Sequence, residues 1–495
     1  MLSSDYFEER AMLSFMKLQK FLDLAKSHSR IAVFKEIPGD RLTPVNIYYA
    51  LAEDYKSISM LESCSNSSLD KCSYLCLAPY AEFIANSSEK TERVDVFAGL
   101  EEALLAYRFY MENPHGLSVC SAIGFMSYDA IRLFENIPDS HKNIINIPDL
   151  FFRFYRISIA FIHDVGKVVI SVVTEVGGDP RQDYQKSMQL IEDIIGKLHR
   201  NHINKIKSRA KGGYSSGVSV DVNDAEYIAK VAKAKQHIVD GDAFQIVLSR
   251  TFTKNFTASP FDIYRALRIT NPSPYMFYLE YDDFVVVGAS PEKLISIKNR
   301  SVETNPIAGT RPRGHDEGED VRLAQELLQD EKEIAEHMML VDLGRNDLGA
   351  VCIPESVKVT KLKEIQKFSS VMHLTSVVVG ELAKNKSIID ALCSVFPAGT
   401  LTGAPKIRAM EIIDELEVSK RGLYGGAICV VDNQNNLDAC IAIRMAILKD
   451  QVAYVRAGAG VVFDSNPESE SEETKHKANA ILTAIDLAAE GLLCF

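Results

Sequence analysis

The segment GGAICVVDNQNNLDACIAIRMAILKDQVAYVRAGAG, residues 425–460, decides the fold. Runs rich in Val, Ile and Ala, which favour β-strands, lie at 425–432, 438–448 and 451–458. The polar joints between these runs are only a few residues long, and joints of that length make hairpins. The sequence therefore predicts three consecutive antiparallel strands.

Strands and helices alternate around this segment. Further strand-like runs rich in Val lie at 350–363 and 371–382. Apolar residues at helical spacing predict an amphipathic helix at the end of the chain, with the stripe Ala478, Ile481, Leu482, Ile485 and Ala489. The chain thus combines an antiparallel sheet with amphipathic helices.

The composition is that of an ordinary soluble globular protein. The 495 residues are 46% hydrophobic and 25% charged, which excludes a disordered or fibrous chain. With 55 Lys and Arg against 67 Asp and Glu, the net charge of −12 would repel a phosphate backbone, so we expect no nucleic-acid partner. No apolar run approaches the ~20 residues of a membrane span. Asp5, Glu8 and Glu9 lie among the first apolar residues, so we expect no signal peptide. The odd number of cysteines, nine, is typical of thiols in a reducing cytoplasm.

A basic run followed by glycine and serine interrupts the chain. Residues 197–211 include Lys and Arg but no acidic residue, and GGYSSG follows at 212–217. This pattern is typical of a solvated linker. We expect an N-terminal domain at 1–200, a linker at 201–222 and a C-terminal domain at 223–495.

The strand predicted at 438–448 has one face of large apolar residues and one of small residues around Arg444. A single arginine among small residues predicts a positively charged hollow, although an arginine paired with a structural carboxylate would leave the same pattern. Gly458-Ala459-Gly460 ends the next strand and favours the hollow, because glycine lets backbone N–H groups approach an anion closely.

Two glutamate pairs stand at i,i+3 spacing, so each pair shares one helix face. Glu333 and Glu336 lie in a predicted helix at 331–340, and Glu470 and Glu473 begin the last helix. Such pairs are most often solvated. Four carboxylates without a matching run of lysines are nevertheless a candidate site for Mg2+, which takes oxygen ligands.

Two segments dense in Gly, Pro and Thr, 306–314 and 397–406, are predicted to be loops that offer amide and hydroxyl donors. His373 lies in the middle of the strand predicted at 371–382, where a histidine is normally a core residue. Together with the glutamates, these elements indicate a carboxylate-bearing substrate, Mg2+, and acid–base chemistry by Glu and His.

These segments resemble a known family, the chorismate-utilising enzymes, and within it anthranilate synthase component I. The similar motifs are PIAGTRPRG (306–314), DEKEIAEHMMLVDLGRNDLG (330–349), VMHLTSVVVGEL (371–382), GTLTGAPKIRAMEIIDELE (399–417), YGGAICV (424–430) and RAGAGVV (456–462). The resemblance covers essentially all of 225–490. Before residue 200 it is thinner and rests on Met60–Ser63.

The resemblance implies an α+β fold of two stacked, mostly antiparallel sheets flanked by helices. It also implies conversion of chorismate and ammonia to anthranilate and pyruvate, the first committed step of tryptophan biosynthesis. The ammonia would come from a separate glutamine amidotransferase subunit, component II, in a heterotetramer, since no Cys-His-Glu glutaminase sequence is recognisable in this chain.

The resemblance further implies roles for single residues. Glu336 and Glu473 would contact Mg2+ directly. Glu333 and Glu470 would act on the metal through water, or would support the two ligating carboxylates without touching the metal. Glu292 would be the general acid that helps the 4-hydroxyl leave. His373 and Thr400 match active-site positions, and we assign His373 to the later loss of pyruvate.

The remaining matched positions are binding residues. The substrate would be held by Gly309, Thr310, Tyr424, Arg444, Gly458, Ala459, Gly460 and Lys477. Tryptophan, as a feedback inhibitor, would be held by Glu62, Ser63, Asn271, Pro274, Tyr275 and Met276; a rigid turn is the alternative for Asn271–Pro274.

Two positions bear on the subtype. Isochorismate and salicylate synthases use a lysine base in a Lys-Val-Val-Leu segment, where this chain has Gln245, whose amide cannot act as a base at neutral pH. Aminodeoxychorismate synthases commonly carry Pro-Ile-Lys-Gly-Thr, where this chain has Ala308. Both residues favour anthranilate synthase, and an aminodeoxyisochorismate synthase is the alternative that they leave open.

Overall fold

The computed structural model describes residues 14–63, 72–87, 93–112, 119–200, 217–367 and 371–491. Its helices are α2 (Leu18–Leu24), α3 (Pro44–Leu51), α4 (Arg93–Ala106), α5 (Pro180–Arg200), α6 (Asp224–Val239), α7 (Pro260–Thr270), α8 (Glu317–Gln329), α9 (Glu331–Gly349), α10 (Ile388–Val395), α11 (Gly399–Thr402), α12 (Lys406–Leu416) and α13 (Pro467–Ala489). None of the helices in these ranges has both the length and the apolar composition to cross a bilayer.

The strands are β1 (Arg30–Pro38), β2 (Ser59–Glu62), β3 (Cys72–Ala85), β4 (Cys120–Met126), β5 (Leu150–Ile162), β6 (Lys167–Glu175), β7 (Ser219–Val220), β8 (Gln245–Asn255), β9 (Tyr275–Glu280), β10 (Val285–Ser290), β11 (Lys293–Lys298), β12 (Ser301–Thr304), β13 (Ile307–Pro312), β14 (Lys358–Lys367), β15 (Val371–Glu381), β16 (Gly403–Ala404), β17 (Ala427–Asp432), β18 (Leu437–Ile441), β19 (Met445–Lys449) and β20 (Val452–Val461).

The strands form two long antiparallel runs. One run is β15, β12, β11, β18, β17, β4 and β5. The other is β3, β2, β9, β10, β19, β20 and β8, and β3 pairs with β5 to connect the two. A hydrophobic cluster with members from both runs, including Phe125, Phe277 and Ile428, packs between them. The expected fold of mixed helix and antiparallel sheet is confirmed.

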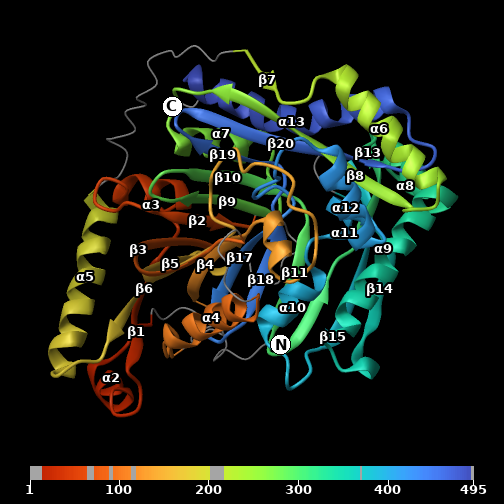
Figure 1. Ribbon diagram of the computed structural model, residues 1–495. Helices are drawn as coiled ribbons and strands as arrows, with labels where there is room; N and C mark the ends of the chain where they lie inside the picture. The colour runs from red at the N-terminus through yellow and green to blue at the C-terminus, as the bar shows by residue number, and fades with distance from the viewer. Residues whose placement is uncertain are drawn as a thin grey trace.

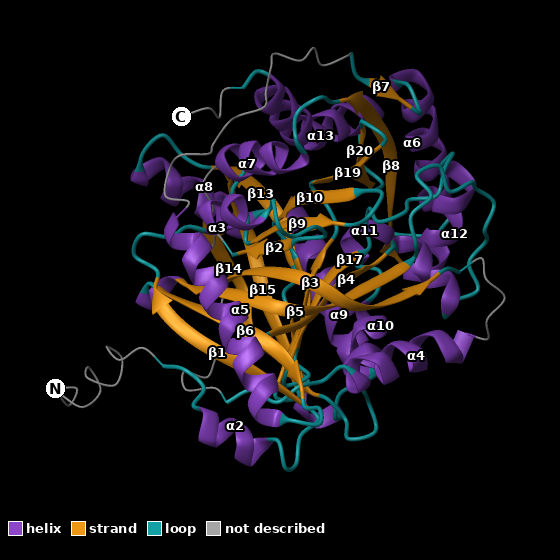
Figure 2. Ribbon diagram, turned by 90° about the vertical axis from the view of Figure 1, so that its left-hand side faces the viewer, coloured by secondary structure: helices purple, strands orange, loops and turns teal. Residues whose placement is uncertain are grey.

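Helices cover the outer faces of the sheets, as Figure 2 shows with the strands in the centre and the helices around them. The apolar stripe predicted for the last helix is confirmed, because Ala478, Ile481, Leu482, Ile485 and Ala489 of α13 are all buried. This stripe packs with residues of α7 and β20 into the largest buried cluster. The helix that carries Glu470 and Glu473 is thereby fixed against the sheet.

Strands from before residue 200 pair with strands from later in the chain (Figure 1). In the ladder between β2 and β9, Glu62 lies opposite Met276, and β4 pairs with β17 along its length. The division into domains at 1–200 and 223–495 stays a prediction. Of the expected linker, residues 201–216 lie outside the described residues.

The predicted hairpins are present, but two strand boundaries were wrong. The strand expected at 438–448 is interrupted, because β18 ends at Ile441 and Arg444 has φ +50°, a left-handed conformation that a regular strand excludes. The strand expected at 350–363 begins only at Lys358, because Pro354–Ser356 form a short 3-10 helix instead.

The two segments expected to be loops are partly regular. Residues 307–312 form β13, which pairs with β15 so that Thr310 lies opposite His373. The ladder shifts register around Gly309, which has φ +68°. The other segment contains α11 and the short strand β16. Both segments nevertheless turn their polar groups toward the site described next.

Candidate active site

Glu292 and Thr400 meet at the end of β10. Thr400, in α11, donates its hydroxyl to Glu292 Oε1 at 2.9 Å. Burial raises the pKa of Glu292 to about 7, although the Thr400 hydroxyl and the charge of Lys477 act in the opposite direction. A carboxyl group with this pKa is partly protonated at neutral pH, as a general acid must be.

His373, in β15, is held by the neighbouring strand β13. Its Nδ1 lies 3.0 Å from the Gly309 carbonyl oxygen and 3.0 Å from Thr310 Oγ1. A carbonyl only accepts, so we assign the proton to Nδ1 and the lone pair to Nε2. Burial lowers the pKa of His373, with a further contribution from nearby Arg444, so the ring is neutral at pH 7 and can accept a proton.

The glycines of β20 make room for polar side chains. A Cβ atom at Gly458 would lie 2.8 Å from Tyr424 Oη, and one at Gly460 would lie 3.2 Å from Gln245 Nε2. Lys477 Nζ donates to the Gly458 carbonyl at 3.0 Å. The side chain of Ala459, between them, is fully buried. The residues predicted to hold the substrate from β20 and α13 therefore do lie together.

Arg444 lies in the same region. Burial is the largest cause that lowers its pKa, while Tyr424 and Glu473 are close enough to raise it. The left-handed backbone at Arg444 separates β18 from β19 and directs the chain away from strand geometry. Arg444 is thus brought into electrostatic range of predicted substrate-binding and metal-binding residues.

Helices α9 and α13 bring their glutamates within electrostatic range of one another. Burial raises the pKa of Glu336, and the charges of Glu333 and Glu473 raise it further. Burial likewise raises the pKa of Glu470, and Glu473 adds to this effect. Neighbouring carboxylates that raise each other's pKa favour a bound cation between them.

Three of these four carboxylates contact a nitrogen donor from the protein. Gln245 Nε2 donates to Glu336 Oε1 at 3.1 Å, Lys477 Nζ lies 2.5 Å from Glu473 Oε1, and Arg311 Nη1 donates to Glu333 Oε1 at 3.3 Å. Within the described ranges, no three His, Cys, Asp or Glu side chains are arranged closely enough to hold a metal. The all-oxygen donor set nevertheless fits Mg2+.

Sequence reasoning missed Arg311 and the buried network beneath the site. Arg311 also donates to Asp330 Oδ2 at 2.7 Å and so joins β13 to the start of α9. Buried Glu417 accepts from Arg421 and Arg456, at 2.6 Å each, and its pKa is lowered because the two arginines outweigh burial. The i,i+4 spacing of Glu417 and Arg421 was the available signal.

The residues predicted to bind tryptophan also lie together. Glu62 is opposite Met276 in the β2–β9 ladder, next to Tyr275, and Ser63 directly follows β2. Buried Glu62 accepts from Tyr264 Oη at 2.7 Å and from Arg268 Nε at 3.0 Å. Asn271 ends α7, the helix that carries both donors, and Pro274 precedes β9.

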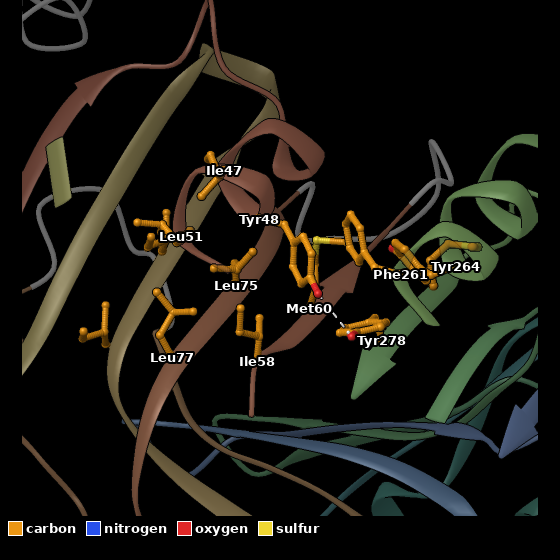
Figure 3. Close-up of a cluster of buried hydrophobic side chains, with 14 of the residues drawn as sticks. Ile47, Tyr48, Leu51, Ile58, Met60, Leu75, Leu77, Phe261, Tyr264 and Tyr278 are labelled. Carbon is orange, nitrogen blue, oxygen red and sulfur yellow. Dashed lines mark hydrogen bonds between the residues drawn. The ribbon is translucent and has the colours of Figure 1, made fainter. Parts of the chain in front are cut away.

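An aromatic cluster packs beside this region. In Figure 3, Met60 lies among Tyr48, Phe261, Tyr264 and Tyr278, and the Tyr48 and Tyr278 hydroxyls are 3.2 Å apart. The rings of Tyr48 and Phe261 stack at 3.4 Å between centroids. Buried aromatic rings thus pack beside Glu62.

Comparisons with known proteins agree with this geometry. The family model of the chorismate binding enzymes matches residues 57–483. The anthranilate synthase component 1 of Acetivibrio thermocellus is 40% identical over 94% of this chain and 97% of its own length, and that of Aquifex aeolicus is 36% identical over 96% and 98%.

Solved structures agree as well. Anthranilate synthase component I of Streptococcus pneumoniae is 37% identical, covers 90% of this chain and 98% of its own, and superposes with a TM-score of 0.72. The menaquinone-specific isochorismate synthase of Escherichia coli also has a TM-score of 0.72, but at 17% identity it supports the fold alone. This chain therefore belongs to the chorismate binding enzymes, in the group of anthranilate synthase component I.

Proposed function

We propose that this chain converts chorismate and ammonia to anthranilate and pyruvate. The observation that supports this best is the contact between Thr400 and Glu292, whose pKa of about 7 suits proton donation to a leaving hydroxyl. The relatives named anthranilate synthase component 1 support the same reaction.

The chain's own residues have separable roles in this reaction. Glu292 protonates the 4-hydroxyl as it leaves, and neutral His373 takes a proton at Nε2 during the loss of pyruvate. Arg444, Lys477 and the amides of Gly458–Gly460 hold the carboxylates of the substrate. The rest of the substrate site is lined by Tyr424, Gly309 and Thr310.

Mg2+ would be held by Glu336 and Glu473, with Glu333 and Glu470 behind them. When bound, it neutralises a substrate carboxylate. The raised pKa of Glu336 beside two other glutamates supports this assignment. Lys477 contacts Glu473 and Arg311 contacts Glu333, and these ion pairs hold the two carboxylates in place beside the site.

The test is a fluorescence assay for anthranilate with chorismate, MgCl2 and an ammonium salt, followed by product analysis. Anthranilate and pyruvate in equal amounts are expected. Aminodeoxychorismate, or an aminated product that retains the enolpyruvyl group, would instead identify the alternative synthases. No turnover at all would contradict the proposal and favour a regulatory chorismate-binding subunit.

Feedback inhibition by tryptophan is the second part of the proposal. It is supported by the ladder through β2, β9, β10, β19 and β20, which connects Glu62 to Gly458 strand by strand. A ligand that moved β2 would therefore act on β20 through hydrogen-bonded neighbours. Equilibrium binding of tryptophan, measured by its fluorescence, tests this directly, since the protein contains no Trp.

The ammonia is proposed to come from a glutamine amidotransferase subunit. This is supported by the relatives' designation as component 1, which implies a second component. Gln245, next to Gly460, supports ammonia over water as the nucleophile, because an amide cannot deprotonate water.

A further inference from the structure

Ser290 is the last residue of β10, two residues before Glu292, and its side chain is fully buried. Its hydroxyl donates to the Ile441 carbonyl at 2.7 Å and accepts from the Glu292 N–H at 3.4 Å. Pro291, between the two residues, has no N–H with which to fix the turn. One hydroxyl therefore ties the turn that carries Glu292 to the last residue of β18.

The backbone of Glu292 is bonded to the same residue of β18. The Ile441 N–H donates to the Glu292 carbonyl at 3.0 Å, so Ile441 contacts this turn through both of its backbone polar groups. At the carboxyl end of the Glu292 side chain, the Thr400 hydroxyl donates to Oε1 at 2.9 Å. The position of the carboxyl group is thus set by Thr400 at its tip and by Ile441 at its base.

Ile441 begins the short segment that leads to Arg444, and this segment has other hydrogen bonds. The Ala289 N–H donates to the Arg444 carbonyl at 3.0 Å. Ala442 is bonded in both directions to residues 425–426, at 2.9 Å each. These bonds do not involve the Ser290 hydroxyl. Its loss would therefore release the turn at Glu292 while Arg444 kept its place.

We infer that Ser290 is a positioning residue that holds the general acid Glu292 against the segment bearing Arg444. The inference rests on the proposed function, in which Glu292 protonates the departing hydroxyl while Arg444 holds a carboxylate of the same substrate. A proton donor must lie within hydrogen-bonding distance of the atom that it protonates, and a displacement of ~1 Å can cost on the order of 10²-fold in rate. Because Ser290 is fully buried, it sets this distance without contacting the substrate.

The experiment is a double-mutant cycle with Ser290→Ala and Glu292→Gln in the full-length chain, assayed for anthranilate with chorismate, MgCl2 and an ammonium salt. Ser290→Ala alone should lower kcat roughly 10- to 100-fold. It should change the KM for chorismate less than threefold, because the bonds that hold Arg444 remain. In the Glu292→Gln background the same substitution should change kcat less than twofold, because the side chain that Ser290 positions is no longer an acid.

Ser171→Ala is the matched control. Ser171, in β6, is also a buried serine whose hydroxyl donates to a backbone carbonyl of the neighbouring strand, that of Ser158 at 3.0 Å. Both Ser→Ala variants should lower the Tm, but Ser171→Ala should keep kcat within twofold of the unmutated chain. Should Ser290→Ala fail to fold, Ser290→Cys, which retains a weak donor of similar size, takes its place in the cycle with the same expected coupling to Glu292.

A loss of kcat that is equal in the two backgrounds would overturn the inference, because it would show that Ser290 acts on the fold as a whole and not through Glu292. An unchanged kcat in Ser290→Ala, or an equal loss in Ser171→Ala, would overturn it as well. No anthranilate from the unmutated chain would instead refute the proposed function.

Discussion

Replacing Glu292 by glutamine tests the catalytic assignment and its energetic cost together. The fold raises the pKa of this carboxyl group from 4.5 to about 7. Compared with the unfolded chain, folding therefore shifts the balance from the carboxylate toward the neutral acid by about 3 kcal/mol. The folded state binds more protons than the unfolded state between these pH values. The free energy of unfolding therefore falls as pH rises from 4.5 to 7 and stays lower above pH 7.

Glu292→Gln removes this loss because glutamine has no proton to release. We expect the variant and the unmutated protein to be similarly stable at pH 4.5 to 5. At pH 8 the variant should be the more stable by up to ~3 kcal/mol. For 495 residues the unfolding entropy is roughly 1 kcal/mol/K, so the difference in Tm is about 3 °C.

Glu292→Gln should lower activity even though it raises stability at pH 8. Without its general acid, the variant should lose ~10²–10⁴ in kcat/KM. In the unmutated enzyme, kcat/KM should fall about tenfold per pH unit above 7, when total ammonium is adjusted to hold free NH3 constant. Anthranilate fluorescence and thermal unfolding at pH 5 and pH 8 provide both measurements. A variant that keeps a tenth of the activity, or whose Tm difference is the same at both pH values, would refute the reasoning.

Four further substitutions test other parts of the site. Glu336→Gln should remove most activity and weaken Mg2+ binding by calorimetry, whereas exposed Glu331→Gln in the same helix should change both less than twofold; equal damage would contradict the metal assignment. Ser63→Phe should abolish tryptophan binding and inhibition with turnover nearly intact, and unchanged inhibition would move the regulatory site elsewhere. Gln245→Lys should weaken amination and produce some isochorismate, but only some, because a lysine at this position acts as a base only if its pKa is lowered. Substantial isochorismate from the unmutated enzyme would refute the subtype argument. Glu417→Gln should lower the free energy of unfolding in urea by ~3–5 kcal/mol, because it leaves two buried arginines short of a counter-charge, and a loss below 1 kcal/mol would show that water compensates them.

Local patterns predicted the parts of the fold that depend on neighbours in sequence. The short polar joints predicted hairpins, and these are present as β17–β18 and β19–β20. Helical spacing predicted the buried stripe of α13 and put each glutamate pair on one face. The resemblance assigned both Glu292 and Thr400 to the active site, but their contact was found only in the structure.

The features that were missed depend on contacts distant in sequence or on unusual backbone. Alternation of residue size does not reveal that Arg444 adopts φ +50° and breaks its strand. The Gly and Pro content of 306–314 predicts a loop, yet residues 307–312 form β13 by pairing with β15. Arg311 reaches Asp330 and Glu333 only because that pairing sets it over α9.

The pairing of β2 with β9 and of β4 with β17 has a consequence for dissecting this protein. Strands β9 and β17 each have a neighbour from before residue 200 on one side and a neighbour from the later part of the chain on the other. A fragment that begins near residue 223 would carry every residue assigned to chemistry, but both strands would become bare edges with unpaired N–H and C=O groups. Such edges recruit other chains, so the fragment should aggregate during expression. Supplying residues 1–200 as a separate chain should restore a soluble complex, because the missing strands complete those edges.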